Sequence, residues 1–217
     1  MTGAFAFRDR DDAGVQLAER LDHLASREPV VLALPRGGVP VAAHVAARLR
    51  APLDILVVRK LGVPSQPELA MGAIGEEGAR VLEPTVLRHA GITAKQLAAV
   101  EATERAEIQR RAVRYRGGRA PVPLEGRVVV IVDDGIATGS TARAAIQIAR
   151  DRGAAGVVLA VPVAAAETAR ELAQLVDELI CVATPPHFVA VGQFYGNFAQ
   201  VSDDDVASLL SPPTGGE

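Results

Sequence analysis

Short, continuously apolar segments alternate along this chain with segments of helical periodicity, and this alternation restricts the possible folds more than any other feature. The expected strands are VVLAL (30–34), LDILVV (53–58), RVVVIV (127–132), GVVLAV (156–161) and ELICVA (178–183). The expected helices are 15–25, capped by Asp11 or Asp12, 39–49, 93–115, capped by Thr93, 141–153 and 164–176. Strands without polar alternation are covered on both faces. The pattern therefore predicts an α/β fold, a parallel sheet flanked by helices.

Composition supports one folded domain over residues 1–217, with 211–217 as a loose tail. Of the 217 residues 49% are hydrophobic and 23% charged, which is enough apolar material for a core. The net charge of −3 gives no argument for nucleic acid or an anionic membrane. No apolar run reaches the roughly 18 residues of a membrane span, and the N-terminus does not resemble a signal peptide. We therefore expect a cytoplasmic protein that binds neither nucleic acid nor a membrane.

The single cysteine, Cys181, excludes a disulfide within the chain and a multi-cysteine metal site. Because it lies in the apolar segment ELICVA, we expect a buried core thiol.

The segment VVVIVDDGIATGSTARAA (128–145) is the strongest candidate for a ligand site. In parallel sheets, ligands bind at the carboxyl ends of strands. Here two acids follow a strand, and then a loop of glycine and hydroxyl residues opens a helix, whose N-terminal N–H groups favour an anion. The loop lacks the lysine of a Walker A motif, and no G-x-G-x-x-G is present. Carboxylates suit vicinal hydroxyls, so the segment predicts a sugar phosphate site. A helix cap followed by an acidic turn would explain only one of the acids.

This segment resembles the phosphoribosyl pyrophosphate (PRPP) motif of type I phosphoribosyltransferases. The resemblance implies a Rossmann-like sheet with a small hood. It implies transfer of 5-phosphoribosyl from PRPP to a nitrogen nucleophile, such as a purine, with Mg²⁺ as cofactor. Asp133 and Asp134 would be catalytic, holding the ribose hydroxyls, and would contact the metal directly or through water. The 5′-phosphate would be held by Gly135, Ile136, Ala137, Thr138, Gly139, Ser140 and Thr141.

Two further loops fit the resemblance. LALPRGGVP (32–40) follows a strand, and in the family this loop binds pyrophosphate, often with an unusual cis peptide, which assigns that role to Arg36, Gly37 and Gly38. A turn that needs two glycines is the alternative. Arg59 and Lys60 resemble a basic pair that lies near pyrophosphate, with Lys60 catalytic; a solvated edge is the alternative. Residues 60–92 would form a mobile loop or hairpin that closes over the site.

The C-terminal arm, residues 184–200, would form the hood, with help from the N-terminus. Its segment PPHFVAVGQFYGNF (185–198) resembles the base-binding arm of hypoxanthine-type members, where Phe188 would stack on the base beside Val189. The alternative is a hydrophobic cap that packs on itself. Six arginines lie between 105 and 119, and most of them would form a solvated face. A contribution to pyrophosphate binding across a homodimer is the alternative.

Two departures leave the acceptor open. Ala137 stands where hypoxanthine-type members have an aspartate, and the position of their purine-reading lysine falls near Pro162. An enzyme is therefore expected, and a PRPP- or nucleotide-sensing regulatory protein on the same fold is the alternative. The paired acids make another kind of phosphate-binding α/β protein a weaker third choice.

Overall fold

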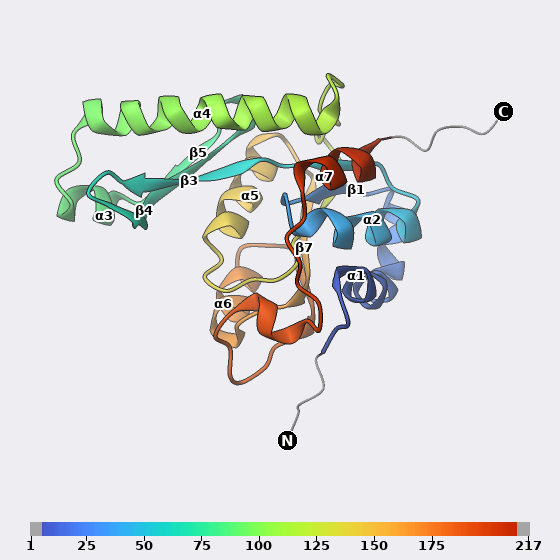
Figure 1. The fold of residues 1–217 in the computed structure, drawn as a ribbon. Helices are drawn as coiled ribbons and strands as arrows, with labels where there is room; N and C mark the ends of the chain where they lie inside the picture. The colour runs from blue at the N-terminus through green and yellow to red at the C-terminus, as the bar shows by residue number, and fades with distance from the viewer. Residues whose placement is uncertain (1–5, 212–217) are drawn as a thin grey trace.

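A five-stranded parallel sheet forms the centre of the computed structural model, which describes residues 6–211 (Figure 1). The strand order is β2-β1-β6-β7-β8, with bounds β1 Val30–Ala33, β2 Leu53–Ile55, β6 Val128–Val132, β7 Gly156–Val163 and β8 Glu178–Ala183. The predicted parallel α/β fold is confirmed. The predicted tail 211–217 lies, apart from Ser211, outside the described residues.

Helices cover both faces of this sheet, which is why its inner strands β1, β6 and β7 are apolar throughout. On β1, Val31 and Ala33 pack toward α1 (Arg10–Glu19) and α2 (Gly38–Leu49). Val30 and Leu32 point to the opposite face and pack with α5 (Ser140–Asp151) and α6 (Ala166–Ala173). Successive strand side chains alternate in direction, so each buried residue of β1 serves one of two cores.

The first helix differs from its prediction. It begins at Arg10, capped by the Asp9 carboxylate, which accepts from the Asp12 N–H. It ends at Glu19 and is followed by the 3-10 helix Asp22–Arg27. The predicted range of 15–25 and the predicted caps Asp11 or Asp12 are therefore wrong. The first turn has no apolar residue of its own, so periodicity alone placed the start of the helix too late.

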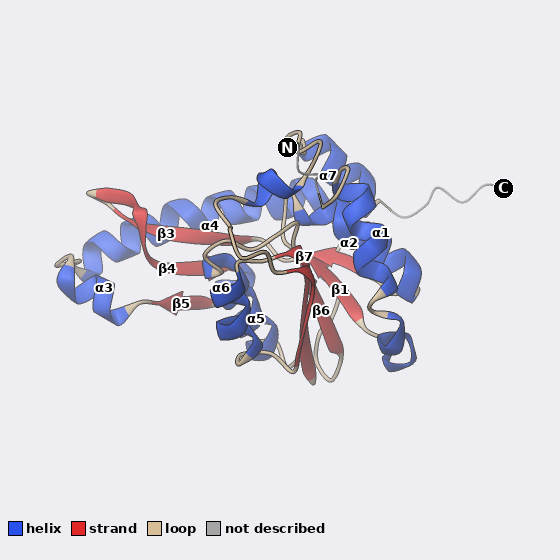
Figure 2. Ribbon diagram, turned by 90° about the horizontal axis from the view of Figure 1, so that it is seen from below, coloured by secondary structure: helices blue, strands red, loops and turns tan. Residues whose placement is uncertain are grey.

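A second, antiparallel sheet projects from the central one (Figure 2). It contains β3 Val58–Val63, β4 Gln66–Gly75 and β5 Arg80–Leu82, and the 3-10 helix Glu76–Gly78 joins the last two strands. The predicted strand 53–58 is thus two elements, because β2 ends at Ile55. The predicted segment 60–92 contains a hairpin, as expected, and then α3 (Pro84–His89).

The long helix α4 (Ala94–Arg116) packs along this second sheet (Figure 1). Thr93 caps it as predicted, with its side chain accepting from the Gln96 N–H. The apolar contact surface between helix and sheet includes Leu61, Met71, Ile74 and Ile108.

A buried ion network joins the two sheets. The guanidinium of Arg116, at the end of α4, donates to Asp54 Oδ1 at 2.7 Å and to Glu76 Oε2 at 2.5 Å. Asp54, Glu76 and Arg116 are 4%, 8% and 5% exposed. The remaining carboxylate oxygens accept backbone N–H groups, from Val57 to Glu76 Oε1 at 3.1 Å and from Val122 to Asp54 Oδ2 at 2.9 Å. The projecting sheet is therefore anchored at its base by charge-assisted hydrogen bonds.

The arm after β8 packs against the first described residues, which include Phe7. It includes the 3-10 helix Val191–Phe194 and leads to α7 (Asp203–Leu210). Phe7 and Tyr195 are buried together, with Phe188 and Phe194 packed against them. Cys181 on β8 is only half-buried and is not the fully buried thiol predicted. Within residues 6–211, no helix combines the length and apolar character needed to cross a membrane.

Candidate functional site

The predicted acid pair lies at the carboxyl end of the central strand β6, beside the loop that follows β1. Leu34 N–H donates to the Val132 carbonyl at 2.8 Å, which holds this loop against the strand. A Cβ at Gly37 would lie 2.0 Å from Asp134 Oδ2, and one at Gly38 would lie 2.9 Å from Asp133 Cα. Both glycines are therefore required because the loop approaches the acids so closely.

The two carboxylates are strongly coupled. Asp134 N–H donates to Asp133 Oδ1 at 2.9 Å. Burial, followed by repulsion from Asp134, raises the pKa of Asp133 well above its usual value. Burial also raises the pKa of Asp134, and the charge of Arg10 opposes that rise. Two such carboxylates are stabilised by a ligand that supplies donors or positive charge.

Arg10 is a site residue that the sequence reasoning missed. Its Nε and Nη2 each lie 2.8 Å from Asp134 Oδ2. The Tyr195 hydroxyl adds a hydrogen bond of 2.5 Å to the Asp134 carbonyl. These residues come from α1 and from the arm, 124 and 61 positions away from Asp134. No local motif marks either of them.

The loop after the acids presents backbone donors. Within residues 6–211, the backbone N–H groups of 137–141 donate to no acceptor. Gly139, with φ 75°, directs the chain into α5, whose first turn adds to this group of free donors. Thr168 fixes the loop from outside by donating its hydroxyl to the Ala137 carbonyl at 2.7 Å. This geometry suits a phosphate group.

Ile136 does not fit the predicted phosphate loop as a donor. Its N–H bonds to the Val163 carbonyl at 2.9 Å, and its carbonyl accepts from Ala165 N–H at 3.0 Å. Its side chain is buried. Ile136 therefore extends the β6–β7 pairing by one residue, and the free N–H groups begin at Ala137.

The phosphoribosyl transferase domain model matches residues 12–198. The chain belongs to this family. Two Mycobacterium tuberculosis proteins, each named "Putative phosphoribosyl transferase", are 58% identical over 204 residues. The match covers 94% of this chain and 46% of theirs, so the chain spans about half the length of these curated relatives. The crystal structure of TT1426 from Thermus thermophilus is 45% identical, with a TM-score of 0.83, and the match covers 94% of this chain and 97% of that chain.

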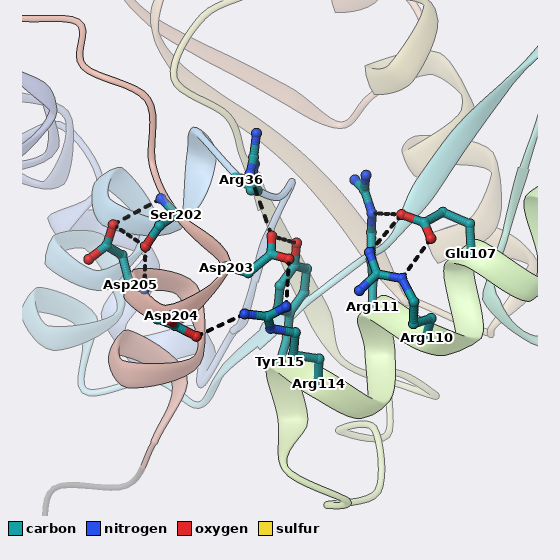
Figure 3. A network of polar contacts seen from close by, with 10 residues as sticks. All are labelled: Arg36, Glu107, Arg110, Arg111, Arg114, Tyr115, Ser202, Asp203, Asp204 and Asp205. Carbon is teal, nitrogen blue, oxygen red and sulfur yellow. Dashed lines mark hydrogen bonds and ion pairs between the residues drawn. The ribbon is translucent and has the colours of Figure 1, made fainter.

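The loop after β1 has the cis peptide that the resemblance implied, between Pro35 and Arg36. Arg36 Nη1 lies 3.6 Å from Asp203 Oδ1 of α7 (Figure 3). Gly38 N–H donates to the Leu34 carbonyl, so it is not free for an anion. The structure thus brings the residues predicted to bind pyrophosphate, 36–38, next to the acid pair.

The side chains of Arg59 and Lys60 on β3 point to opposite faces of the second sheet. Arg59 Nε donates to Glu104 Oε2 of α4 at 2.7 Å. Lys60 Nζ lies 3.4 Å from Glu68 Oε2. Lys60 also lines a cavity of about 620 Å³ together with Thr138, Ser140 and Thr141. Lys60 is therefore on the phosphate-loop side of the second sheet, whereas Arg59 faces the helix.

The arginines between 105 and 119 are not one solvated face. Arg110 and Arg111 both donate to Glu107, and together they lower its pKa to about 2 (Figure 3). Arg114 pairs with Asp203 and Asp204. Arg116 is an exception to the predicted solvated face, because it is buried in the network with Asp54 and Glu76.

In the arm, Phe188 packs on Phe194 with ring centroids 5.2 Å apart. Val189 is 88% exposed, and its N–H donates to Gln193 Oε1 at 3.1 Å. The contact between Phe188 and Phe194 matches the hydrophobic cap that packs on itself, which was the alternative to stacking of Phe188 on a base.

Proposed function

We propose that the chain transfers the 5-phosphoribosyl group of PRPP to a nitrogen nucleophile, a purine or related base, and releases pyrophosphate. One observation carries the proposal: the carboxylates of Asp133 and Asp134 and the free N–H groups of 137–141 belong to one strand–loop–helix unit. Carboxylates accept from vicinal hydroxyls, and N–H groups at a helix N-terminus donate to phosphate. The unit therefore matches the two ends of a ribose 5-phosphate.

In this reaction the bond from C1 of the ribose to the pyrophosphate oxygen breaks, and its electron pair leaves with pyrophosphate. A bond forms from C1 to the acceptor nitrogen, whose proton passes to solvent or to the leaving group. The transition state resembles an oxocarbenium ion, as in glycoside chemistry. Asp133 and Asp134 would hold the ribose hydroxyls and stabilise the developing positive charge.

Mg²⁺ fits best as an ion that enters with PRPP. Within the described residues, no group of three or more His, Cys, Asp and Glu side chains is arranged to hold a metal. Asp134 Oδ2 is occupied by Arg10, and Asp133 Oδ1 by the Asp134 N–H. Asp133 and Asp134 would contact such an ion directly or through water, and the ion would neutralise charge on the pyrophosphate.

Pyrophosphate would lie between the loop of Arg36 and Gly37 and the side of the second sheet that carries Lys60. Closure of the projecting segment 60–92 would bring Lys60 toward the phosphates and exclude water from the reactive ribose. The ion pairs that Arg36 and Lys60 form with described residues are long, at 3.6 and 3.4 Å, and an incoming anion would replace them.

Pyrophosphate release tests this function. The protein is incubated with PRPP and Mg²⁺ against purines, pyrimidines and related heterocycles. We expect one acceptor to stimulate release. PRPP binding without release under any acceptor would favour the sensing protein, and failure to bind PRPP or any ribonucleotide would contradict both functions.

Gly37→Ala is expected to weaken PRPP binding by about tenfold or more, because overpacking costs about 1–3 kcal/mol. The new Cβ would collide with Asp134 Oδ2. Isothermal titration calorimetry measures the loss. Gly91→Ala is the control: it has φ 61° but open space around it, so it should lower stability and leave binding intact. Equal affinity for wild type and Gly37→Ala would argue against a ligand at the acid pair.

We also propose a homodimer and a single domain over 1–217. Analytical ultracentrifugation checks the first, and a single cooperative unfolding transition checks the second.

A further inference from the structure

The N-terminal segment of the described chain pairs with residues 194–197 of the arm, close to the acid pair. Phe7 N–H donates to the Phe194 carbonyl at 3.0 Å, and Gly196 N–H donates back to the Phe7 carbonyl at 2.9 Å. Asn197 N–H continues the pairing to the Arg8 carbonyl at 2.7 Å. Helix α1 begins immediately afterwards, at Arg10. The backbone on which Arg10 stands is therefore fixed by main-chain hydrogen bonds to the arm.

The Arg10 guanidinium is held on three sides. Nε and Nη2 bond to Asp134 Oδ2, and Nη1 donates to the Ala199 carbonyl at 2.7 Å. The guanidinium carbon lies 3.9 Å from the ring centroid of Phe198, a cation–π contact. The Arg10 side chain is 12% exposed and that of Asp134 13%. This is an ordered interaction, unlike a solvated surface pair.

The contacts are arranged so that one oxygen of Asp134 stays available. Both Arg10 bonds go to Oδ2, and Oδ1 accepts no hydrogen bond from any residue between 6 and 211. Tyr195 binds the main-chain carbonyl of Asp134 and not the carboxylate. Arg10 thus holds the Asp134 side chain through Oδ2, while Oδ1 can accept a hydrogen bond from a hydroxyl group.

We infer that Arg10 is a positioning residue that orients the Asp134 carboxylate toward the ribose hydroxyls of the ligand. The inference rests on the proposed function. Arg10 acts through Asp134 and does not itself bind the ligand. The pairing of the N-terminal segment with the arm then has a role as well, because it fixes the position of Arg10.

A double-mutant cycle tests this, with PRPP binding measured by isothermal titration calorimetry. The variants are Arg10→Gln, Asp134→Asn and the two combined. We expect Arg10→Gln to weaken PRPP binding by about tenfold or more. In the Asp134→Asn background the same change should alter affinity by less than about twofold, because its effect passes through Asp134. Arg10→Lys, which keeps the charge and one donor, should recover part of the loss.

Pyrophosphate and Arg8→Gln serve as controls. Pyrophosphate has no ribose, so its affinity should be the same for wild type and Arg10→Gln. Arg8 is close in sequence, but its side chain is 82% exposed and forms a surface ion pair with Asp12, so Arg8→Gln should bind PRPP within about twofold of wild type. Thermal melts confirm that each variant is folded.

Three outcomes would overturn the inference and leave the proposed function standing. Unchanged affinity in Arg10→Gln would show that Asp134 needs no partner. Tighter binding would show that Arg10 blocks the site. Losses that add fully in the double variant would show a merely structural role. By contrast, wild-type protein that binds no PRPP would overturn the proposed function and this inference together.

Discussion

Asp134→Asn is expected to lower kcat/KM for pyrophosphate release by about 10²- to 10³-fold, as when a preorganised electrostatic group is lost. The amide has the shape of the carboxylate but not its charge, so it cannot stabilise a developing oxocarbenium ion. It also presents a donor where Arg10 donates now, at 2.8 Å from Oδ2. Initial rates with the acceptor that stimulates release, and PRPP titration calorimetry, measure the two effects.

Asp151→Asn is a matched control for this prediction. Asp151 ends the same helix that the phosphate loop opens, and its carboxylate accepts only from Gln147, at 2.8 Å. The control should retain wild-type rates. If Asp134→Asn kept full activity in a folded protein, the assignment of the acid pair to the ribose would be wrong.

Arg116→Met is expected to lower the free energy of unfolding by about 3–5 kcal/mol, the usual cost of breaking a buried ion pair on one side. Methionine fills much of the space but donates nothing. Asp54 and Glu76 would then share a buried site with only backbone N–H groups to compensate their charges. The Ile55 carbonyl, which accepts from Arg116 Nη2 at 2.8 Å, would also lose its partner. Denaturant unfolding measures the change.

Arg105→Met on the same helix is the control for Arg116→Met. Its side chain is 40% exposed and lies 3.7 Å from Glu101, so its loss should cost less than about 1 kcal/mol. Similar losses in the two variants would contradict a special role for the buried network. Because the network lies at the base of the second sheet, Arg116→Met should also speed proteolysis within 60–92.

The central sheet could be predicted because its evidence is local. The three inner strands, β1, β6 and β7, are buried along their whole length and therefore read as apolar runs, as in VVVIV (128–132). The boundary at 53–58 failed because the apolar run continues from β2 into β3, through Leu56 and Val57, which are buried but belong to neither strand. An apolar run indicates that residues are buried, but it does not indicate where the backbone pairing between strands ends.

The candidate site divides in the same way. The acids, the glycines and the loop that opens α5 are consecutive in sequence, so their spacing alone predicted an anion site at the end of a strand. Which N–H groups of that loop remain free was not predictable, because the N–H of Ile136 is taken by Val163 from the next strand. Similarly, the sequence assigned Gly37 to pyrophosphate, with a glycine turn as the alternative, and did not predict the close contact with Asp134 that requires a glycine there.

The sequence by itself determined the parallel sheet and the family, and it predicted the phosphate-binding loop, because each of these depends on residues that are neighbours along the chain. Only the tertiary structure decided that Arg10 neutralises Asp134 and that Arg116 is buried between two acids. An arginine in a charged segment looks the same whether it is solvated or enclosed. What differs is the partner, which is distant in sequence. Asp54 lies 62 positions from Arg116, and Asp134 lies 124 positions from Arg10. Burial then turns an ordinary surface charge into a fixed and oriented one.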